Sequence, residues 1–264
     1  MLELKNITKI FNAGTVNEKV ALDGVSLTLN DGDFVTVIGG NGAGKSTMLN
    51  AVAGTYPPDG GTVTVDGVNI TRLPEHKRAK FIGRVFQDPM MGTAADMWIE
   101  ENMAIANRRG MRRGLRWAIT PKERVRYREM LSELELGLED RLSTKVGLLS
   151  GGQRQALTLL MAVMKQPKVL LLDEHTAALD PKTAATVLML SEKFISEYKL
   201  TTLMVTHNMK DAIAHGNRLI MMNAGKIVLD ISGEEKKKLT VEKLLELFSK
   251  SSGTEFTNDR ALLG

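Results

Sequence analysis

A glycine-rich segment between an apolar run and a helical pattern constrains this chain more than any other feature. Residues 39–46 read Gly-Gly-Asn-Gly-Ala-Gly-Lys-Ser, which fits the pattern Gly-x-x-x-x-Gly-Lys-[Ser/Thr], and they directly follow the β-branched and apolar residues 34–38. A strand before this pattern and a helix after it are the context in which it forms a P-loop. A plain glycine-rich turn is the alternative, but Lys45 and Ser46 stand in register and argue against it.

The chemistry of such a loop is the binding of a triphosphate. Glycines let the backbone approach the phosphates closely, and successive N–H groups at the start of the following helix form an anion site. Lys45 can reach the β- and γ-phosphates, and the Ser46 hydroxyl can ligate Mg²⁺. The predicted nucleotide contacts of this segment are Gly39, Gly40, Asn41, Gly42, Ala43, Gly44, Lys45, Ser46 and Thr47.

Composition narrows the class of protein. Hydrophobic residues make up 43% of the 264 residues and charged residues 25%, as in an ordinary globular protein. The chain has no cysteine, which excludes disulfides and cysteine-based metal sites. The net charge of +4 does not demand nucleic acid. We see no signal peptide, and the longest apolar stretch is too short to span a bilayer, so we expect any membrane association to be peripheral.

The order of the predicted elements indicates an α/β fold. Short strands with alternating polar and apolar residues are predicted at 2–7, 25–29 and 62–65. Apolar runs typical of buried strands lie at 34–38, 169–172 and 202–206. We therefore expect a P-loop NTPase core with a mixed sheet and an N-terminal antiparallel β subdomain.

The region from about 89 to 166 has a different texture and is expected to be an inserted α-helical subdomain. Thr120 and Glu123 form a predicted capping box, and the helix that follows is expected to continue through Leu131, Leu134 and Leu136. Ser150 and Gln153 predict a capping box for a later buried helix. The expected division is a core at about 1–88 and 167–232, the helical subdomain at about 89–166, and a C-terminal helix and tail at about 233–264, loosely ordered from 249.

Two acids follow the most apolar strand of the chain. Asp173 and Glu174 stand at the carboxyl end of residues 169–172, where ligands gather in open α/β sheets. Asp173 is suited to hold Mg²⁺ opposite Ser46, and Glu174 to accept a proton from, or to orient, an attacking water. Capping of a loop is the alternative, which the upstream P-loop makes the weaker one.

Gln87 and His207 each follow a predicted strand, and by themselves they mean little. A structural role is the better interpretation of an isolated histidine. Glutamine, however, orients the attacking water in several P-loop enzymes, and His207 stands at another strand edge that would bring it beside the γ-phosphate.

Together these segments resemble the ATP-binding subunit of an ABC transporter. In the family's order the chain carries Walker A (39–46), the Q-loop glutamine, the signature motif (149–153), Walker B (169–174), the D-loop (178–180) and the switch histidine. The signature motif separates this family from other P-loop NTPases. The resemblance implies an ATPase with ATP and Mg²⁺ as cofactors. Its implied catalytic residues are Glu174, His207, Gln87 and Lys45, and its implied metal ligands are Ser46, Gln87 and Asp173.

The resemblance also implies a head-to-tail dimer, in which the signature loop of one subunit closes over ATP held by the other. The implied contacts from these loops are Ser150, Gly151, Gly152, Gln153 and Asp180, with Gln87. Phe11 stands where the family places an aromatic residue that stacks on adenine, with a core role as the alternative. His175 departs from the usual proline after the Walker B glutamate, and we expect it to alter loop stiffness and leave the chemistry intact.

Several partners are implied by the same resemblance. They are integral membrane permease subunits, an extracytoplasmic substrate-binding protein and a second ATPase subunit, with the chain on the cytoplasmic side of the membrane and no nucleic acid. A short, single cassette resembles bacterial importers, and the sequence is similar to subunits of amino-acid uptake, aromatic amino acids included. The predicted docking groove contains Pro89, Met90, Met91, Met97 and Trp98, although core packing of some of these is an open alternative.

Two other classes of function stay open. A soluble ABC ATPase of DNA repair or translation usually has a coiled-coil insertion or tandem cassettes, which this sequence lacks. A regulatory module without turnover is disfavoured by Glu174 and His207. A cluster of basic residues lies within the predicted helical subdomain. We expect it to form a solvated helical face, and contact with lipid headgroups is the weaker alternative. Its members are Arg108, Arg109, Arg112, Arg113 and Arg116, with Trp117.

Overall fold

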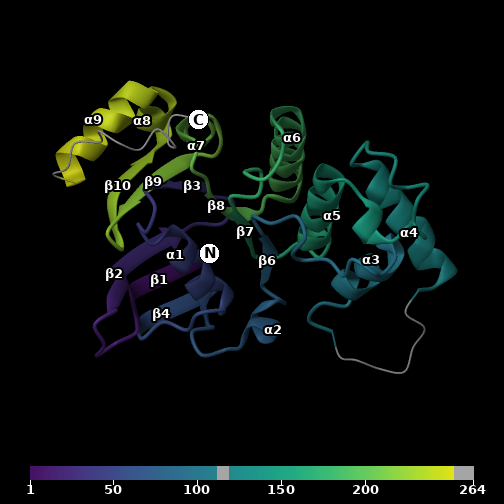
Figure 1. Ribbon diagram of the computed structural model, residues 1–264, viewed down its shortest axis with the longest axis horizontal. Coiled ribbons are helices and arrows are strands. Elements are labelled where there is room, and N and C mark those ends of the chain that lie inside the picture. Colours follow the sequence, from purple (N-terminus) through teal and green to yellow (C-terminus); the bar gives the residue numbers. More distant parts are fainter. Residues whose placement is uncertain (112–118, 253–264) are drawn as a thin grey trace.

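The computed structural model describes residues 1–111 and 119–252, whose strands form two sheets (Figure 1). The antiparallel sheet has the order β2-β1-β4-β5, and the larger sheet has the order β10-β9-β3-β8-β7-β6, parallel except for β10 at its edge. The strands are β1 (Leu2–Phe11), β2 (Lys19–Leu29), β3 (Phe34–Ile38), β4 (Gly60–Val65), β5 (Val68–Asn69), β6 (Ile82–Val85), β7 (Val169–Asp173), β8 (Thr201–Val205), β9 (Arg218–Asn223) and β10 (Lys226–Ser232).

Helices flank the larger sheet (Figure 1). They are α1 (Lys45–Ala53), α2 (Glu75–Arg78), α3 (Ile99–Asn107), α4 (Pro121–Ser132), α5 (Gly151–Val163), α6 (Pro181–Tyr198), α7 (Met209–Ala214), α8 (Gly233–Lys237) and α9 (Val241–Ser252), with a short 3-10 helix at Val146–Leu148. Within the ranges that the structure describes, none of these helices is long and apolar enough to cross a membrane.

Strand β7 has a hydrophobic core on each of its faces. Val169 and Leu171 pack in the cluster formed with α1 and the antiparallel sheet, whereas Leu170 and Leu172 pack in the cluster formed with α3 to α6. Successive side chains of a strand point to opposite faces, so a strand that is buried on both faces must be apolar throughout. This double burial fixes the end of β7, where Asp173 stands.

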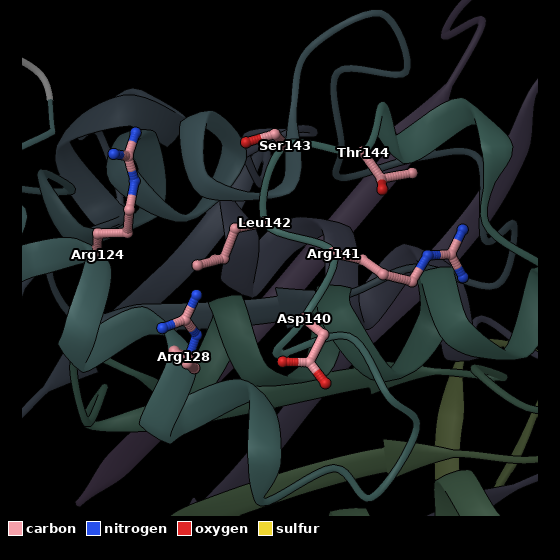
Figure 2. A pocket seen from close by; sticks show the side chains of 7 residues that line it. All are labelled: Arg124, Arg128, Asp140, Arg141, Leu142, Ser143 and Thr144. Atoms are coloured by element: carbon pink, nitrogen blue, oxygen red, sulfur yellow. The ribbon is translucent and has the colours of Figure 1, made fainter.

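A polar cavity of about 350 Å³ lies between α4 and the loop that precedes α5. Figure 2 shows Arg124 and Arg128 projecting from α4 on one side, with Asp140 and Arg141 in the loop. The Arg124 guanidinium donates to both carboxylate oxygens of the buried Glu100, at 2.6 and 2.8 Å. Because this bidentate pair satisfies a buried carboxylate, the cavity belongs to the packing of α4 on α3.

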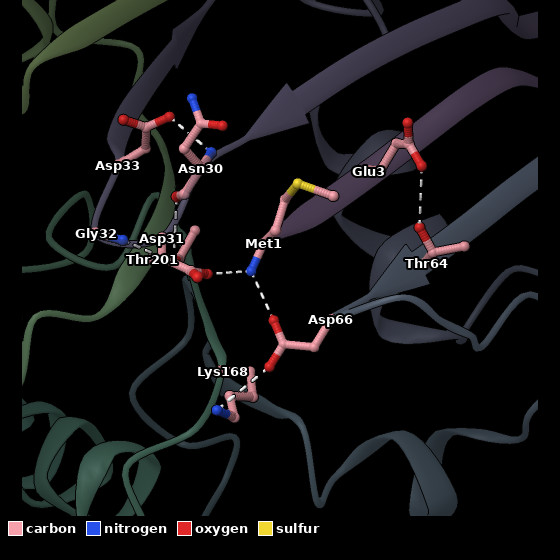
Figure 3. A network of polar contacts seen from close by, with 10 residues as sticks. All are labelled: Met1, Glu3, Asn30, Asp31, Gly32, Asp33, Thr64, Asp66, Lys168 and Thr201. Carbon is pink, nitrogen blue, oxygen red and sulfur yellow. Dashed lines mark hydrogen bonds and ion pairs between the residues drawn. The ribbon is translucent and has the colours of Figure 1, made fainter.

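Polar contacts join the two sheets at the amino ends of β7 and β8 (Figure 3). The Met1 amino group lies 2.6 Å from Asp66 Oδ1, and the other oxygen of that carboxylate pairs with Lys168 Nζ at 3.2 Å. The Gly32 N–H donates to Thr201 Oγ1 at 3.1 Å. The opposite, carboxyl ends of these strands are left free for a functional site.

The sequence predicts the starts of helices better than their ends. Both expected capping boxes form, because the Glu123 N–H donates to Thr120 Oγ1 at 3.2 Å and the Gln153 N–H donates to Ser150 Oγ at 3.3 Å. The predicted continuation of α4 is wrong, since the helix ends at Ser132 and the segment that follows turns through Glu135, with φ 55°. A left-handed residue ends an α-helix. The last helix also continues to residue 252 instead of ending near 248.

The structure describes two residues of the basic cluster, Arg108 and Arg109, and their surroundings differ. The Arg108 guanidinium pairs with Glu123 at 3.1 Å, and the Arg109 guanidinium donates to the Met161 carbonyl on α5. Burial lowers the pKa of Arg109. The expected solvated face is therefore wrong for Arg109, whereas the Arg108 side chain is still 37% exposed. Arg112, Arg113, Arg116 and Trp117 lie outside the described residues.

Candidate nucleotide-binding site

The P-loop joins the carboxyl end of β3 to the start of α1. Gly44 has φ 103°, and a Cβ there would lie 2.6 Å from the Ala21 carbonyl oxygen, so only glycine fits. The buried Lys45 donates from Nζ to the carbonyl oxygens of Gly39 at 2.7 Å and Gly40 at 3.2 Å. Residues 39–47 thus form a loop at a helix N-terminus, with an ammonium group folded over it, which is an arrangement that binds anions.

The predicted catalytic residues meet at one sheet edge beside this loop. Strands β6, β7 and β8 are parallel neighbours, so the residues that follow them share an edge. Glu174 Oε2 lies 3.7 Å from His207 Nδ1. Gln87 and Asp173 line one cavity of about 670 Å³. The structure therefore brings together four residues that come from three separate segments of the chain.

Glu174 has an unusual backbone. Its φ is 43°, in the left-handed region that few residues other than glycine adopt. Its N–H donates to the Val205 carbonyl at 3.0 Å, which ties the turn to β8. Strained residues of this kind persist only where the surroundings hold them, and they cluster at active sites. Here the turn leaves the partly buried carboxylate facing His207.

Oxygen donors suited to Mg²⁺ come from Ser46, Gln87 and Asp173. Burial raises the pKa of Asp173, while Arg84, at 3.2 Å, and the charge of Lys45 act in the opposite direction. Arg84 pairs with this carboxylate, and a hydroxyl, an amide and a carboxylate are the donors that Mg²⁺ accepts. The donor set fits an ion that takes its remaining ligands from phosphates and water.

The signature residues lie away from the P-loop of their own chain. In Figure 1, α5 and α1 stand on opposite sides of β6 to β8. A Cβ at Gly152 would lie 2.0 Å from Thr183 Cγ2, so the packing of α5 on α6 requires glycine there. Asp180 caps α6 by accepting the Thr183 N–H at 3.1 Å. Ser150–Gln153 are therefore brought beside Asp180 and not beside Lys45.

Phe11 lies at the rim of the P-loop. It pairs across β1 and β2 with Lys19, whose Nζ is 3.4 Å from the position of a Cβ on Gly42. The Phe11 ring is half-buried and packs edge-on against Tyr56, with a centroid separation of 5.4 Å. One aromatic edge thus stands beside the loop that would hold the phosphates.

Gln155 is a site residue that the sequence analysis missed. Its side chain is fully buried, and Nε2 donates to the carbonyl oxygens of Phe86 at 2.8 Å and His175 at 2.7 Å. These carbonyls belong to the residues next to Gln87 and Glu174. A single amide therefore joins the Q-loop, the Walker B loop and α5.

Arg154 and Arg84 were missed as well. Arg154 is buried in α5 and donates from Nε to Thr93 Oγ1 at 2.8 Å and from Nη2 to the Met90 carbonyl at 3.3 Å. Arg84 pairs with Asp173 from β6. The sequence did contain a signal for these residues, since each is a polar or charged residue within an apolar helix or strand. Such a residue is buried only where a hydrogen-bonding or charged partner meets it.

His175 contacts α6 in a way that proline cannot. Its Nε2 lies 3.0 Å from Ser191 Oγ, and the Ser191 hydroxyl donates to the Val187 carbonyl at 2.8 Å. A hydroxyl has one proton, so the imidazole must be the donor and carries its proton on Nε2. The side chain thus fastens the loop after Glu174 to α6.

The stability of the folded chain should fall as the pH drops through the range between about 6.5 and about 4. Burial, together with repulsion from His215, lowers the pKa of His175 from 6.5 to about 4, so in this range the unfolded chain binds a proton that the folded chain excludes. The contribution is full above pH 6.5, and its loss amounts to roughly 3 kcal/mol. Denaturant unfolding across this range measures it. A His175→Asn variant should lose less stability, and an identical pH dependence would contradict the assignment.

Comparison with known proteins identifies the relatives of this chain. Residues 22–177 match the ABC transporter family. The chain is 45% identical to a tyrosine transport ATP-binding protein of Clostridioides difficile, over 94% of this chain and 98% of that protein. It is 35% identical to the spermidine/putrescine import ATP-binding protein PotA of Haemophilus ducreyi, over 87% of this chain and 57% of that longer protein.

A solved structure is similar over most of the chain. It is a dimeric ATP-binding cassette in a post-hydrolysis state bound to ADP and Pi, with a TM-score of 0.75 and 31% identity over 88% of this chain and 98% of that one. This likeness confirms the predicted P-loop NTPase fold with its antiparallel and mixed sheets. With the phosphate loop, the acidic strand edge and the family match in agreement, the chain belongs to the ABC transporter family.

Proposed function

We propose that this chain is the motor subunit of an importer for amino acids, with an aromatic amino acid as the cargo. As an ABC transporter ATPase, the chain couples ATP hydrolysis to transport. The observation that carries the catalytic part is the placement of Glu174 and His207, 3.7 Å apart, at the strand edge beside the P-loop. The choice of cargo rests on the 45% identity to a tyrosine transport ATP-binding protein.

Each side chain of the site has a role in this proposal. Lys45 and the N–H groups of residues 39–47 bind the phosphates, and Phe11 stacks on the adenine. Glu174 orients the attacking water and accepts its proton, with His207 beside it. Ser46, Gln87 and Asp173 would hold Mg²⁺, which would supply positive charge to offset the negative charge of the phosphates.

A second copy of the chain completes the site. Ser150 and Gly151 are exposed at the N-terminus of α5, a second anion site without a phosphate loop of its own. A head-to-tail dimer would place this end over the ATP of the partner subunit, and similar cassettes are dimeric. ATP then favours the closed dimer, and loss of the γ-phosphate favours the open one.

The partner in the membrane docks beside the Q-loop. The 670 Å³ cavity is lined by Asn50, Thr55, Glu75, Arg84, Phe86, Gln87, Asp88, Met91, Asp173 and Ala178. Met90, Met91 and Trp98 are 61%, 51% and 43% exposed, whereas Pro89 and Met97 are half-buried. Exposed methionines suit a surface that receives a helix. The predicted docking groove, formed by Pro89, Met90, Met91, Met97 and Trp98, would take a cytoplasmic helix of a permease subunit, with the chain at the cytoplasmic face of the membrane. Of these residues, Met91 also lines the cavity that contains Gln87 and Asp173.

Movement of the groove is transmitted to the signature helix. Arg154 and Gln155 of α5 hold backbone carbonyls of Met90 and Phe86, on either side of Gln87. We infer that residues from about 89 to 166 act as one helical subdomain against the core at about 1–88 and 167–232, followed by a C-terminal segment at about 233–264. An extracytoplasmic substrate-binding protein would deliver the cargo.

Coexpression with the candidate permease subunits and substrate-binding protein tests the proposal. The tagged chain should copurify with the permease, and the reconstituted complex should take up labelled tyrosine only with ATP. Trp98→Asp should abolish copurification and keep nucleotide binding, while Met189→Asp, at an exposed methionine on α6, should copurify normally. Copurification with ribosomes or DNA in place of a permease would refute the transport role.

A further inference from the structure

Arg84 is held against Asp173 from the neighbouring strand. Its Nη2 lies 3.2 Å from Asp173 Oδ2, and both side chains are 13% exposed. Its Nη1 donates to Thr55 Oγ1 at 3.2 Å, and the guanidinium lies 4.5 Å from the centroid of the Phe86 ring. Arg84 therefore neutralises Asp173, which is more buried than the neighbouring carboxylate of Glu174.

This ion pair conflicts with the metal role of Asp173. A divalent cation beside the carboxylate would also lie beside the guanidinium, and like charges repel strongly where water is partly excluded. Arg84 Nε is, moreover, buried without a hydrogen-bond partner among the described residues. A buried donor without a partner makes this position of the guanidinium costly. Both effects favour movement of the Arg84 guanidinium away from Asp173 when a metal ion binds.

The structure offers a second place for the guanidinium. Thr55 Oγ1, which accepts from Arg84, donates in turn to Glu75 Oε1 at 3.2 Å. Glu75, Asp88 and Arg84 line the same cavity. The Glu75 carboxylate is therefore one hydroxyl away from the present position of Arg84.

We propose that Arg84 is the counter-ion of Asp173 in the metal-free state and that it moves from Asp173 toward Glu75 when the metal binds, so that this ion pair sets the affinity for Mg²⁺. The proposal rests on the metal role of Asp173 under the proposed function. Arg84 acts through Asp173 and is a positioning residue. In the metal-free state, the ion pair gives the buried Asp173 carboxylate a partner.

Mn²⁺ binding to the purified full chain in the presence of ADP tests the proposal, with electron paramagnetic resonance as the readout. Arg84→Met keeps the length of the side chain and removes its charge. It leaves an unpaired buried carboxylate, which metal binding relieves, so the affinity for Mn²⁺ should rise on the order of tenfold. ADP affinity in EDTA should stay the same. Arg84→Lys should stay close to the wild type, as should Arg72→Met, at an exposed arginine.

Two further variants keep the outcome decisive. Glu75→Gln removes the second partner of Arg84 and should weaken Mn²⁺ binding several-fold, which tests the proposal even if Arg84→Met does not fold. Unchanged or weaker Mn²⁺ binding in Arg84→Met would overturn it. Asp173→Asn distinguishes the metal role of Asp173 from the counter-ion role of Arg84. Full Mn²⁺ affinity in this variant would refute the metal role of Asp173. Loss of Mn²⁺ affinity in Asp173→Asn, together with no effect of Arg84→Met, would refute the counter-ion role alone.

Discussion

ATP hydrolysis by Glu174→Gln is expected to be slower than in the wild type by at least about 10²-fold, because the amide cannot accept the proton of the attacking water. ATP binding should survive, since the proposed phosphate contacts come from Lys45 and the P-loop. Because ATP then stays intact, the variant should accumulate as an ATP-bound dimer that the wild type forms only transiently.

Steady-state phosphate release and size-exclusion chromatography with ATP or ADP measure both effects. Glu197→Gln is the matched control, because it replaces an exposed carboxylate at the far end of α6. Full turnover in Glu174→Gln would remove this residue from the catalytic assignment. A variant that stays monomeric with ATP would contradict the shared site formed with Ser150 and Gly151.

Gln155→Leu should lower the free energy of unfolding by about 2–6 kcal/mol. The substitution leaves two carbonyl oxygens without their donor, the buried one of His175 and the partly buried one of Phe86, and each lost partner costs about 1–3 kcal/mol. Urea unfolding monitored by far-ultraviolet circular dichroism measures the change. A loss below about 1 kcal/mol would show that water replaces the amide.

Gln155→Glu provides a sharper version of the same experiment. An ionised carboxylate has no proton to donate and would face two carbonyl oxygens, so this variant should be less stable than Gln155→Leu at neutral pH. Burial raises the pKa of such a carboxyl group. The protonated form regains one donor, so its deficit should shrink as the pH falls and grow again as the pH rises through that pKa. A deficit that does not change with pH would contradict this account.

The local parts of the site could be predicted from the sequence. Residues 39–46 carry a spacing that one loop geometry requires, and the apolar run of β7 predicts that Asp173 stands at a strand end. Phosphate binding and strand burial depend on neighbours in the sequence, so pattern and chemistry coincide there.

The contacts that join separate segments could not be predicted in this way. The partners of Gln155 lie 69 and 20 residues away, and those of Arg84 lie 89 and 29 residues away. Such pairs depend on strand order and helix packing, which no periodicity specifies. The end of α4 could not be predicted for a related reason. Leu134 is buried although it lies in a turn, so the apolar periodicity continues beyond the end of the helix.

Arg154 and Gln155 hold the predicted docking segment by the backbone carbonyls of Phe86 and Met90, by the Thr93 hydroxyl and by the Met90 sulfur. The exposed side chains of Met91 and Trp98 take no part in these bonds. Substitutions at these two positions could therefore change which partner the groove binds without disturbing the contacts of Arg154 and Gln155. If this groove receives the permease as proposed, a few substitutions on its surface should suffice to fit this chain to a different permease.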